Sequence, residues 1–144
     1  MSDSKLSIQE RTENFAIRVV KAYVELNKRK YDDAGKVLSK QFLRSGTSIG
    51  ANCSEAVYAQ SRNDFIHKYS ISLKEANETK YWINLMIKLQ IVNELKFTLM
   101  LQELEEIIKI LTASIKKLRG CLKSIRLCQS SQHQTNHSNS NHSF

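Results

Sequence analysis

The side chains with the clearest chemical potential in this 144-residue sequence are lysines and arginines in two regularly spaced rows. The first row is spaced four and four and the second is spaced three, four and three, so each would lie on one face of a helix. The first row contains Lys36, Lys40 and Arg44, and the second contains Lys116, Arg119, Lys123 and Arg126. A row of cations can follow phosphates along a nucleic-acid backbone without reading the bases. We therefore hypothesise that both rows bind RNA or DNA.

The distribution of charge supports this hypothesis and also allows a simpler one. The chain has 22 Lys and Arg against 14 Asp and Glu, for a net charge of +8. No acidic residue follows Glu106, and the six cations beyond it carry six of these eight charges. The helix dipole favours cations only in the last turn of a helix, whereas these cations extend over about five turns. A solvated basic face with no ligand is the alternative to a surface that binds a polyanion.

The residue types that enzymes use are not arranged for catalysis in this sequence. A di-iron or di-manganese site in a helix bundle needs two Glu-x-x-His pairs and two further glutamates. Before residue 129 the chain has a single histidine, His67, which forms one Asp-x-x-His pair with Asp64. The segment 46–50 lacks the lysine and the preceding strand of a phosphate-binding loop, and the three cysteines form no C-x-x-C pair. The sequence predicts a protein that is not an enzyme and that has no metal and no cofactor.

Composition and periodicity predict that the fold is entirely helical. The chain has no proline and only four glycines, and β folds and tight turns use both residues heavily. Apolar residues recur in steps of three and four along four segments, which predicts an all-α protein built as an antiparallel up-down-up-down four-helix bundle. The expected helices run from Ser7 to near Lys28, over about 34–58, from Ser61 to near Val92, and over 95–126.

The centre of the second expected helix contains two glycines, Gly46 and Gly50. Each glycine inside a helix destabilises it by about 1 kcal/mol relative to alanine. Either a loop interrupts the helix, or the small residues allow a neighbouring helix to come close. The positions that keep the helical period across this segment are Leu38, Phe42, Ser45, Ile49 and Ala56. This period favours a continuous helix.

Residues 1–128 are expected to form the bundle, and residues 129–144 a polar tail. The tail has one apolar residue in sixteen, so burial cannot offset the entropy lost on ordering it, and we expect it to be disordered. No segment has the features of a signal peptide or a membrane span. With three cysteines expected to be reduced thiols, the sequence predicts a cytoplasmic protein that does not contact a membrane.

Two segments of the chain resemble a known bacterial family, named for proteins encoded in intervening sequences of large-subunit ribosomal RNA genes. The segments are 41–56, with the run Arg-Ser-x-x-Ser-x-x-Ala-Asn-x-x-Glu-Ala from Arg44, and 64–82. The resemblance covers about residues 10–120. It implies a four-helix bundle that assembles into a ring-shaped homopentamer. One relative in this family, the accessory variability determinant of diversity-generating retroelements, works with a reverse transcriptase, so the resemblance implies RNA, DNA or a protein as partner.

Within these segments we assign structural roles as hypotheses, with direct ligand binding as the alternative. The small residues expected to allow close approach of helices are Ser45, Gly46, Ser48 and Ala51. The polar residues expected to pair between helices or subunits are Asn52, Glu55, Glu75 and Glu78.

The sequence therefore favours a non-enzymatic oligomeric protein that associates with RNA or DNA through its basic rows. The alternative is a protein-interaction scaffold, or an accessory factor for an enzyme such as a reverse transcriptase, with no nucleic-acid affinity of its own.

Overall fold

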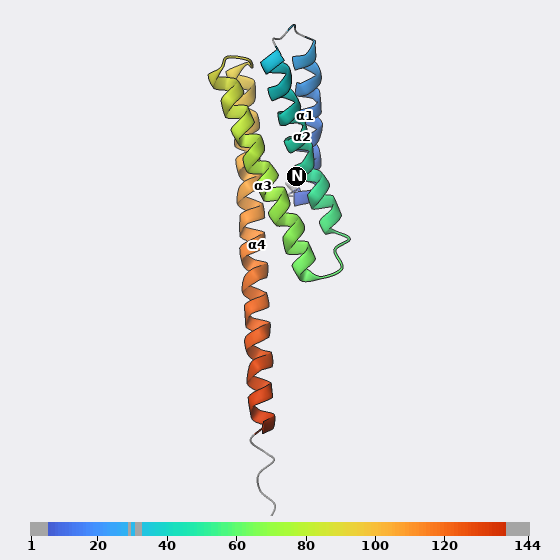
Figure 1. Cartoon of the computed structure of the whole chain (residues 1–144), viewed down its shortest axis with the longest axis vertical. Coiled ribbons are helices and arrows are strands. Elements are labelled where there is room, and N and C mark those ends of the chain that lie inside the picture. Colours follow the sequence, from blue (N-terminus) through green and yellow to red (C-terminus); the bar gives the residue numbers. More distant parts are fainter. Residues whose placement is uncertain (1–5, 29, 31–32, 138–144) are drawn as a thin grey trace, which may run out of the picture.

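The computed structural model describes residues 6–28, 30 and 33–137, which contain four α-helices. These are α1 (Ile8–Asn27), α2 (Asp33–Ala56), α3 (Arg62–Lys88) and α4 (Glu94–His137). Each helix packs against the next one in the chain (Figure 1). The first helix, α1, also packs against α4. The helices on opposite corners meet through core side chains, such as the rings of Phe42 and Phe97, whose centroids are 5.8 Å apart. The predicted all-α four-helix bundle is confirmed.

Side-chain caps fix the starts of two of these helices. The Ser7 hydroxyl accepts a hydrogen bond from the Glu10 amide at 3.2 Å, and the Ser7 amide donates to the Glu10 carboxylate at 2.8 Å. Together these two bonds complete the predicted capping box, and the bond from the Ser7 amide lowers the pKa of Glu10. At α3, the Ser61 hydroxyl accepts from the Asp64 amide at 3.0 Å. Both starts follow from local hydrogen bonding that the sequence makes visible.

The fourth helix is much longer than the helices that cover it. With 44 residues against the 27 of α3, α4 is about 66 Å long and α3 about 40 Å. Figure 1 shows α4 continuing well past the connection between α2 and α3. The last buried apolar side chain on α4 is Ile115, whereas Ile125 is 46% exposed and Leu127 is 69% exposed. We call residues 116–130 the distal segment of α4.

The end of α4 differs from the predicted boundary. The sequence led us to expect the helix to end near 126 and a disordered tail to begin at 129, but the backbone stays helical to His137. No proline occurs, and no glycine follows Gly120. Nothing therefore interrupts the ladder of backbone hydrogen bonds in this stretch. The remainder of the predicted tail, residues 138–144, lies outside the described residues, as do residues 1–5.

Candidate nucleic-acid interface

The first basic row lies on α2, and two of its three cations are paired with carboxylates. The Lys36 ammonium is 3.6 Å from the Asp33 carboxylate, and the Arg44 guanidinium donates to the Glu78 carboxylate at 3.0 Å. Lys40 is exposed. Pairs on a surface contribute at most about 1 kcal/mol to stability. They do, however, neutralise the local charge that would attract a polyanion.

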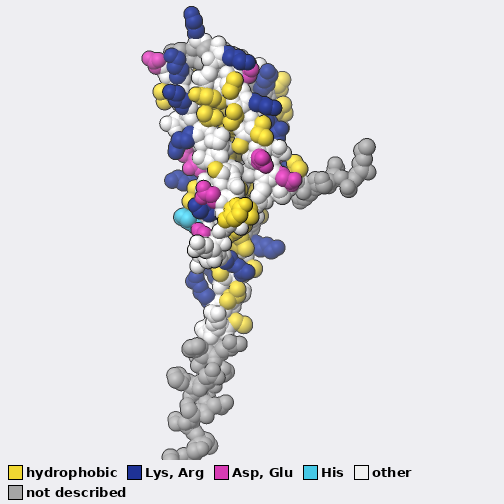
Figure 2. Space-filling model, turned by 90° about the vertical axis from the view of Figure 1, so that its right-hand side faces the viewer, with side chains coloured by type: hydrophobic (Ala, Val, Ile, Leu, Met, Phe, Trp, Pro, Cys, Tyr) yellow, Lys and Arg dark blue, Asp and Glu magenta, His cyan; other side chains and the backbone are white. Residues whose placement is uncertain are grey.

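The second basic row lies on the distal segment of α4, and its environment is different. Lys116, Arg119, Lys123 and Arg126 are all exposed. Within the described part of the chain, no carboxylate lies within 4.0 Å of any of the four. On the face drawn in Figure 2, the charged side chains on α4 below the bundle are basic, with no acidic side chain among them. This row therefore carries uncompensated positive charge.

Three of these four cations line a groove between α3 and α4. The groove has a volume of about 530 Å³ and is lined by Leu73, Thr112, Ile115, Lys116, Arg119, Gly120 and Lys123. Its floor is apolar because it includes Leu73 of α3 and Ile115 of α4, and its rim carries the three cations. Arg126 lies beyond the groove. Sequence reasoning missed Leu73, since its place in the groove depends on how α3 packs against α4.

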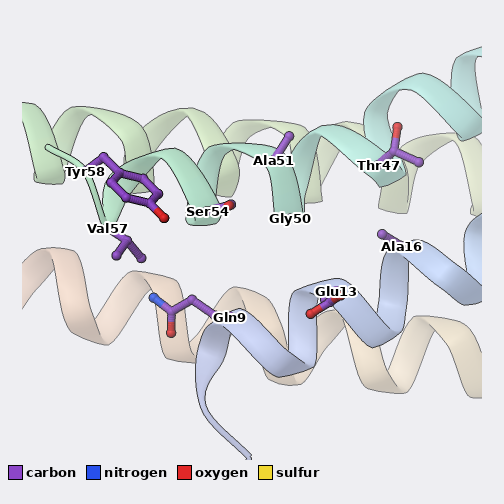
Figure 3. A pocket seen from close by; sticks show the side chains of 9 residues that line it. All are labelled: Gln9, Glu13, Ala16, Thr47, Gly50, Ala51, Ser54, Val57 and Tyr58. Atoms are coloured by element: carbon purple, nitrogen blue, oxygen red, sulfur yellow. The ribbon is translucent and has the colours of Figure 1, made fainter.

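The two glycines at the centre of α2 face α1, and α2 is one continuous helix, as its period predicted. A Cβ atom added at Gly46 would lie 2.8 Å from both methyl carbons of Val19. One added at Gly50 would lie 3.1 Å from the carbonyl oxygen of Thr12. Glycine at these two positions therefore lets α1 and α2 approach closely. Gly50 also lines a groove between the two helices, which Figure 3 shows with residues of α1 along one side and of α2 along the other.

The other small residues of this motif have different surroundings. Ser45 is buried between α2 and α3, where its hydroxyl accepts a hydrogen bond from the Thr79 hydroxyl at 2.9 Å. The Ser48 hydroxyl donates to the carbonyl of Arg44 within α2 at 2.7 Å. Ala51 is exposed and lines the groove between α1 and α2.

Two of the four polar motif residues make ion pairs between α2 and α3. The Lys68 ammonium donates to the Glu55 carboxylate at 2.5 Å, which raises the pKa of Lys68. The Glu78 carboxylate receives hydrogen bonds from Arg44 and from the Trp82 indole, the latter at 3.2 Å. Both carboxylates thus link or brace neighbouring helices within one chain.

Among the described residues, Asn52 and Glu75 make no such pair between helices. The Asn52 side-chain amide donates to the carbonyl of Ser48 at 2.8 Å, which is a bond within α2. One carboxylate oxygen of Glu75, Oε2, is buried and has no hydrogen-bond partner among the described residues.

Metal binding and membrane insertion would each need a specific arrangement of the described residues. No three side chains of His, Cys, Asp or Glu in this part of the chain lie together in a way that could hold a metal ion. None of the four helices, over its described length, is long and apolar enough to cross a bilayer.

Comparison with known proteins places the bundle in a family. The family model described as 23S rRNA-intervening sequence protein matches residues 4–113. A crystal structure of a protein with unknown function, from the S23 ribosomal protein family of Bacteroides thetaiotaomicron, is similar with a TM-score of 0.71 and 43% identity. That match covers 76% of this chain and 99% of the relative. Among curated proteins, none matches.

The family match also divides the candidate interface. The first basic row and the small-residue centre of α2 lie inside residues 4–113, whereas the second basic row lies beyond them. The match confirms the resemblance seen in segments 41–56 and 64–82. The chain belongs to the family of 23S rRNA-intervening sequence proteins.

Proposed function

We propose that this protein is a non-enzymatic oligomer that associates with RNA or DNA through phosphate contacts made by the distal segment of α4. The observation that carries the proposal is the second basic row, which is exposed, acid-free and unpaired within the described residues. Such a row releases counterions from a nucleic acid when it binds, which is the main source of affinity for phosphate backbones. The first row has a lesser role in this proposal, because Lys36 and Arg44 are already paired.

The oligomeric part of the proposal is supported by an apolar stripe on the outer face of α1. Ile17, Val20 and Val24 are spaced three and four apart and are 46%, 43% and 49% exposed. Apolar residues clustered on a surface mark protein contacts. By resemblance to its family the protein would form a ring-shaped homopentamer, and five copies of one basic row would strengthen a weak contact through avidity.

The α1 stripe also favours a second candidate function. The same three apolar side chains would serve a scaffold or accessory factor that holds another protein, such as a reverse transcriptase. In that case the basic row would meet an acidic protein surface, and the protein would have no nucleic-acid affinity of its own.

A salt series of binding to structured RNA and to single-stranded DNA tests the proposal. The four cations of the second row, acting on four phosphates, predict a log–log slope of about −2.8 on single strands, or about −3.6 on a DNA duplex. Changing Lys116, Arg119, Lys123 and Arg126 to Gln is expected to flatten the slope and to abolish most of the binding. The matched control changes four exposed lysines elsewhere, Lys21, Lys74, Lys88 and Lys96, to Gln.

The outcomes separate the two candidate functions. Equal losses in the two variants would show that net charge, rather than the second row, governs binding. No binding at low salt would overturn the nucleic-acid proposal and favour the scaffold. Light scattering on the same samples measures the mass, and a monomer would contradict the oligomeric part.

A further inference from the structure

Packing against a neighbouring helix explains Gly46 and Gly50 of α2, but it does not explain Gly120 of α4. Cβ atoms added at Gly46 and Gly50 would meet α1, but one added at Gly120 would meet nothing within 4 Å. Glycine weakens a helix interior, and no neighbouring element of the described structure requires it here. Gly120 is exposed and lines the groove between α3 and α4. Its missing side chain therefore widens this groove.

The groove combines an apolar floor with a basic rim. Lys116 precedes Gly120 by four residues and Lys123 follows it by three, so both lysines lie on the same side of α4 as the glycine. Arg119 lines the same groove, while Leu73 and Ile115 supply the apolar floor. A free phosphate would use the cations but not the floor. An anion with a flat, weakly polar part would use both.

We infer that this groove binds an unpaired nucleotide, with the base over the floor and its phosphates on the lysines. A base lying over Leu73, Ile115 and the exposed backbone at Gly120 would be within reach of the Arg119 guanidinium, whose plane stacks on bases in other RNA complexes. The volume of about 530 Å³ is within the range of small-molecule sites, about 300–1,000 Å³.

This inference rests on the proposed function and adds a substrate class to it. The bases of a duplex are stacked and paired, so a duplex offers the groove only its phosphates and leaves the apolar floor uncovered. A single strand or an RNA loop offers both parts of the nucleotide. The groove therefore favours unpaired over paired nucleic acid.

The test fills the groove without changing any charge. Gly120→Leu places a side chain in the open space beside the lysines, and leucine is a good helix former, so α4 is expected to stay intact. The matched control, Cys121→Leu, adds a leucine at the next residue, which is exposed and does not line the groove. The probes are single-stranded oligoadenylate and an RNA duplex with the same number of phosphates.

We expect Gly120→Leu to weaken oligoadenylate binding about tenfold or more, as the loss of one stacked base does. Duplex affinity and both salt slopes should stay unchanged, and Cys121→Leu should alter neither affinity. Circular dichroism verifies that both variants keep their helical content. An equal loss of affinity for both probes, or no loss, would overturn the inference that the groove binds an unpaired nucleotide. Either result would leave the phosphate contacts of the proposed function in place. Absence of binding to either RNA by the unmodified protein would overturn both.

Discussion

The centre of α2 and the distal segment of α4 both carry glycine inside a helix, yet the two regions are built for different surroundings. In α2, Gly46 and Gly50 face α1 so closely that a single added carbon would meet Val19 or the backbone at Thr12. In α4, Gly120 faces open space. The same destabilising residue therefore allows close packing in one helix and leaves a groove open in the other.

The cations of the two regions also differ in whether they pair with carboxylates. On α2, Arg44 donates to Glu78 of α3, so the cation takes part in holding two helices together. On α4, the second basic row follows the last acidic residue of the chain, Glu106, in the sequence. Glu106 itself pairs with Lys109, at a distance of 3.4 Å. Two cations of the first row are thus paired with carboxylates on the surface of the bundle, whereas those of the second row have no such partner among the described residues.

The largest expected difference between the two regions is in thiol reactivity. Cys53 of α2 is fully buried, its Sγ atom is 3.2 Å from the Ser72 hydroxyl, and burial raises the pKa of this thiol. Cys121 and Cys128 of the distal segment are exposed. Because the thiolate is the reactive form, iodoacetamide should modify the two exposed cysteines first. Cys53 should react about 10³-fold or more slowly, at a rate set by opening of the fold.

Mass spectrometry of the alkylated protein measures this contrast. Two adducts are expected under native conditions and three in denaturant. Three adducts forming at one rate would contradict the burial of Cys53. Protection of Cys121 and Cys128 would instead mean that another molecule covers the distal segment in solution.

A smaller effect is expected when the close approach of α1 and α2 is disturbed. Gly46→Ala should lower the free energy of unfolding by about 1–3 kcal/mol, because the new carbon meets the stiff, fully buried side chain of Val19. Urea denaturation measures the loss. In a Val19→Ala background the same substitution should be less destabilising, and strict additivity of the two changes would show that Val19 is not the obstacle.

The smallest effect is expected at the glycine of α4, and it should have the opposite sign. Gly120→Ala places its Cβ in open space, so it should raise the free energy of unfolding or the helical content of α4, by at most about 1 kcal/mol. Urea denaturation and circular dichroism measure these two quantities. Destabilisation by Gly120→Ala would show that this position also packs against a neighbour. Gly120 would then not differ from Gly46 and Gly50 of α2.

Much of the fold follows from local rules that the sequence displays. The caps at Ser7 and Ser61 are formed by residues three positions apart, and the periods of three and four identify the apolar face of each helix. The continuity of α2 through Gly46 and Gly50 was predictable for the same reason. The end of α4 was predicted wrongly, because a polar composition near 129 was weighed above the absence of any helix-breaking residue before His137.

The candidate site could be predicted only in part. The spacing of Lys116, Arg119 and Lys123 already placed these cations on one helix face, since that depends only on the pitch of the helix. That Leu73 completes a groove beside them was not foreseeable, because it lies about forty residues earlier and reaches α4 only through the packing of α3.

Sequence alone therefore determined the four helices, their starts, the small-residue centre of α2 and the acid-free second basic row, because each depends on neighbours within a turn or two. The tertiary structure decided which cations are neutralised, which glycines are covered and where α4 emerges from the bundle. Glu78 reaches Arg44, and Val19 closes over Gly46, only when helices far apart in sequence are packed side by side. Packing between helices is set by the shapes of whole faces, and no short stretch of sequence contains that information.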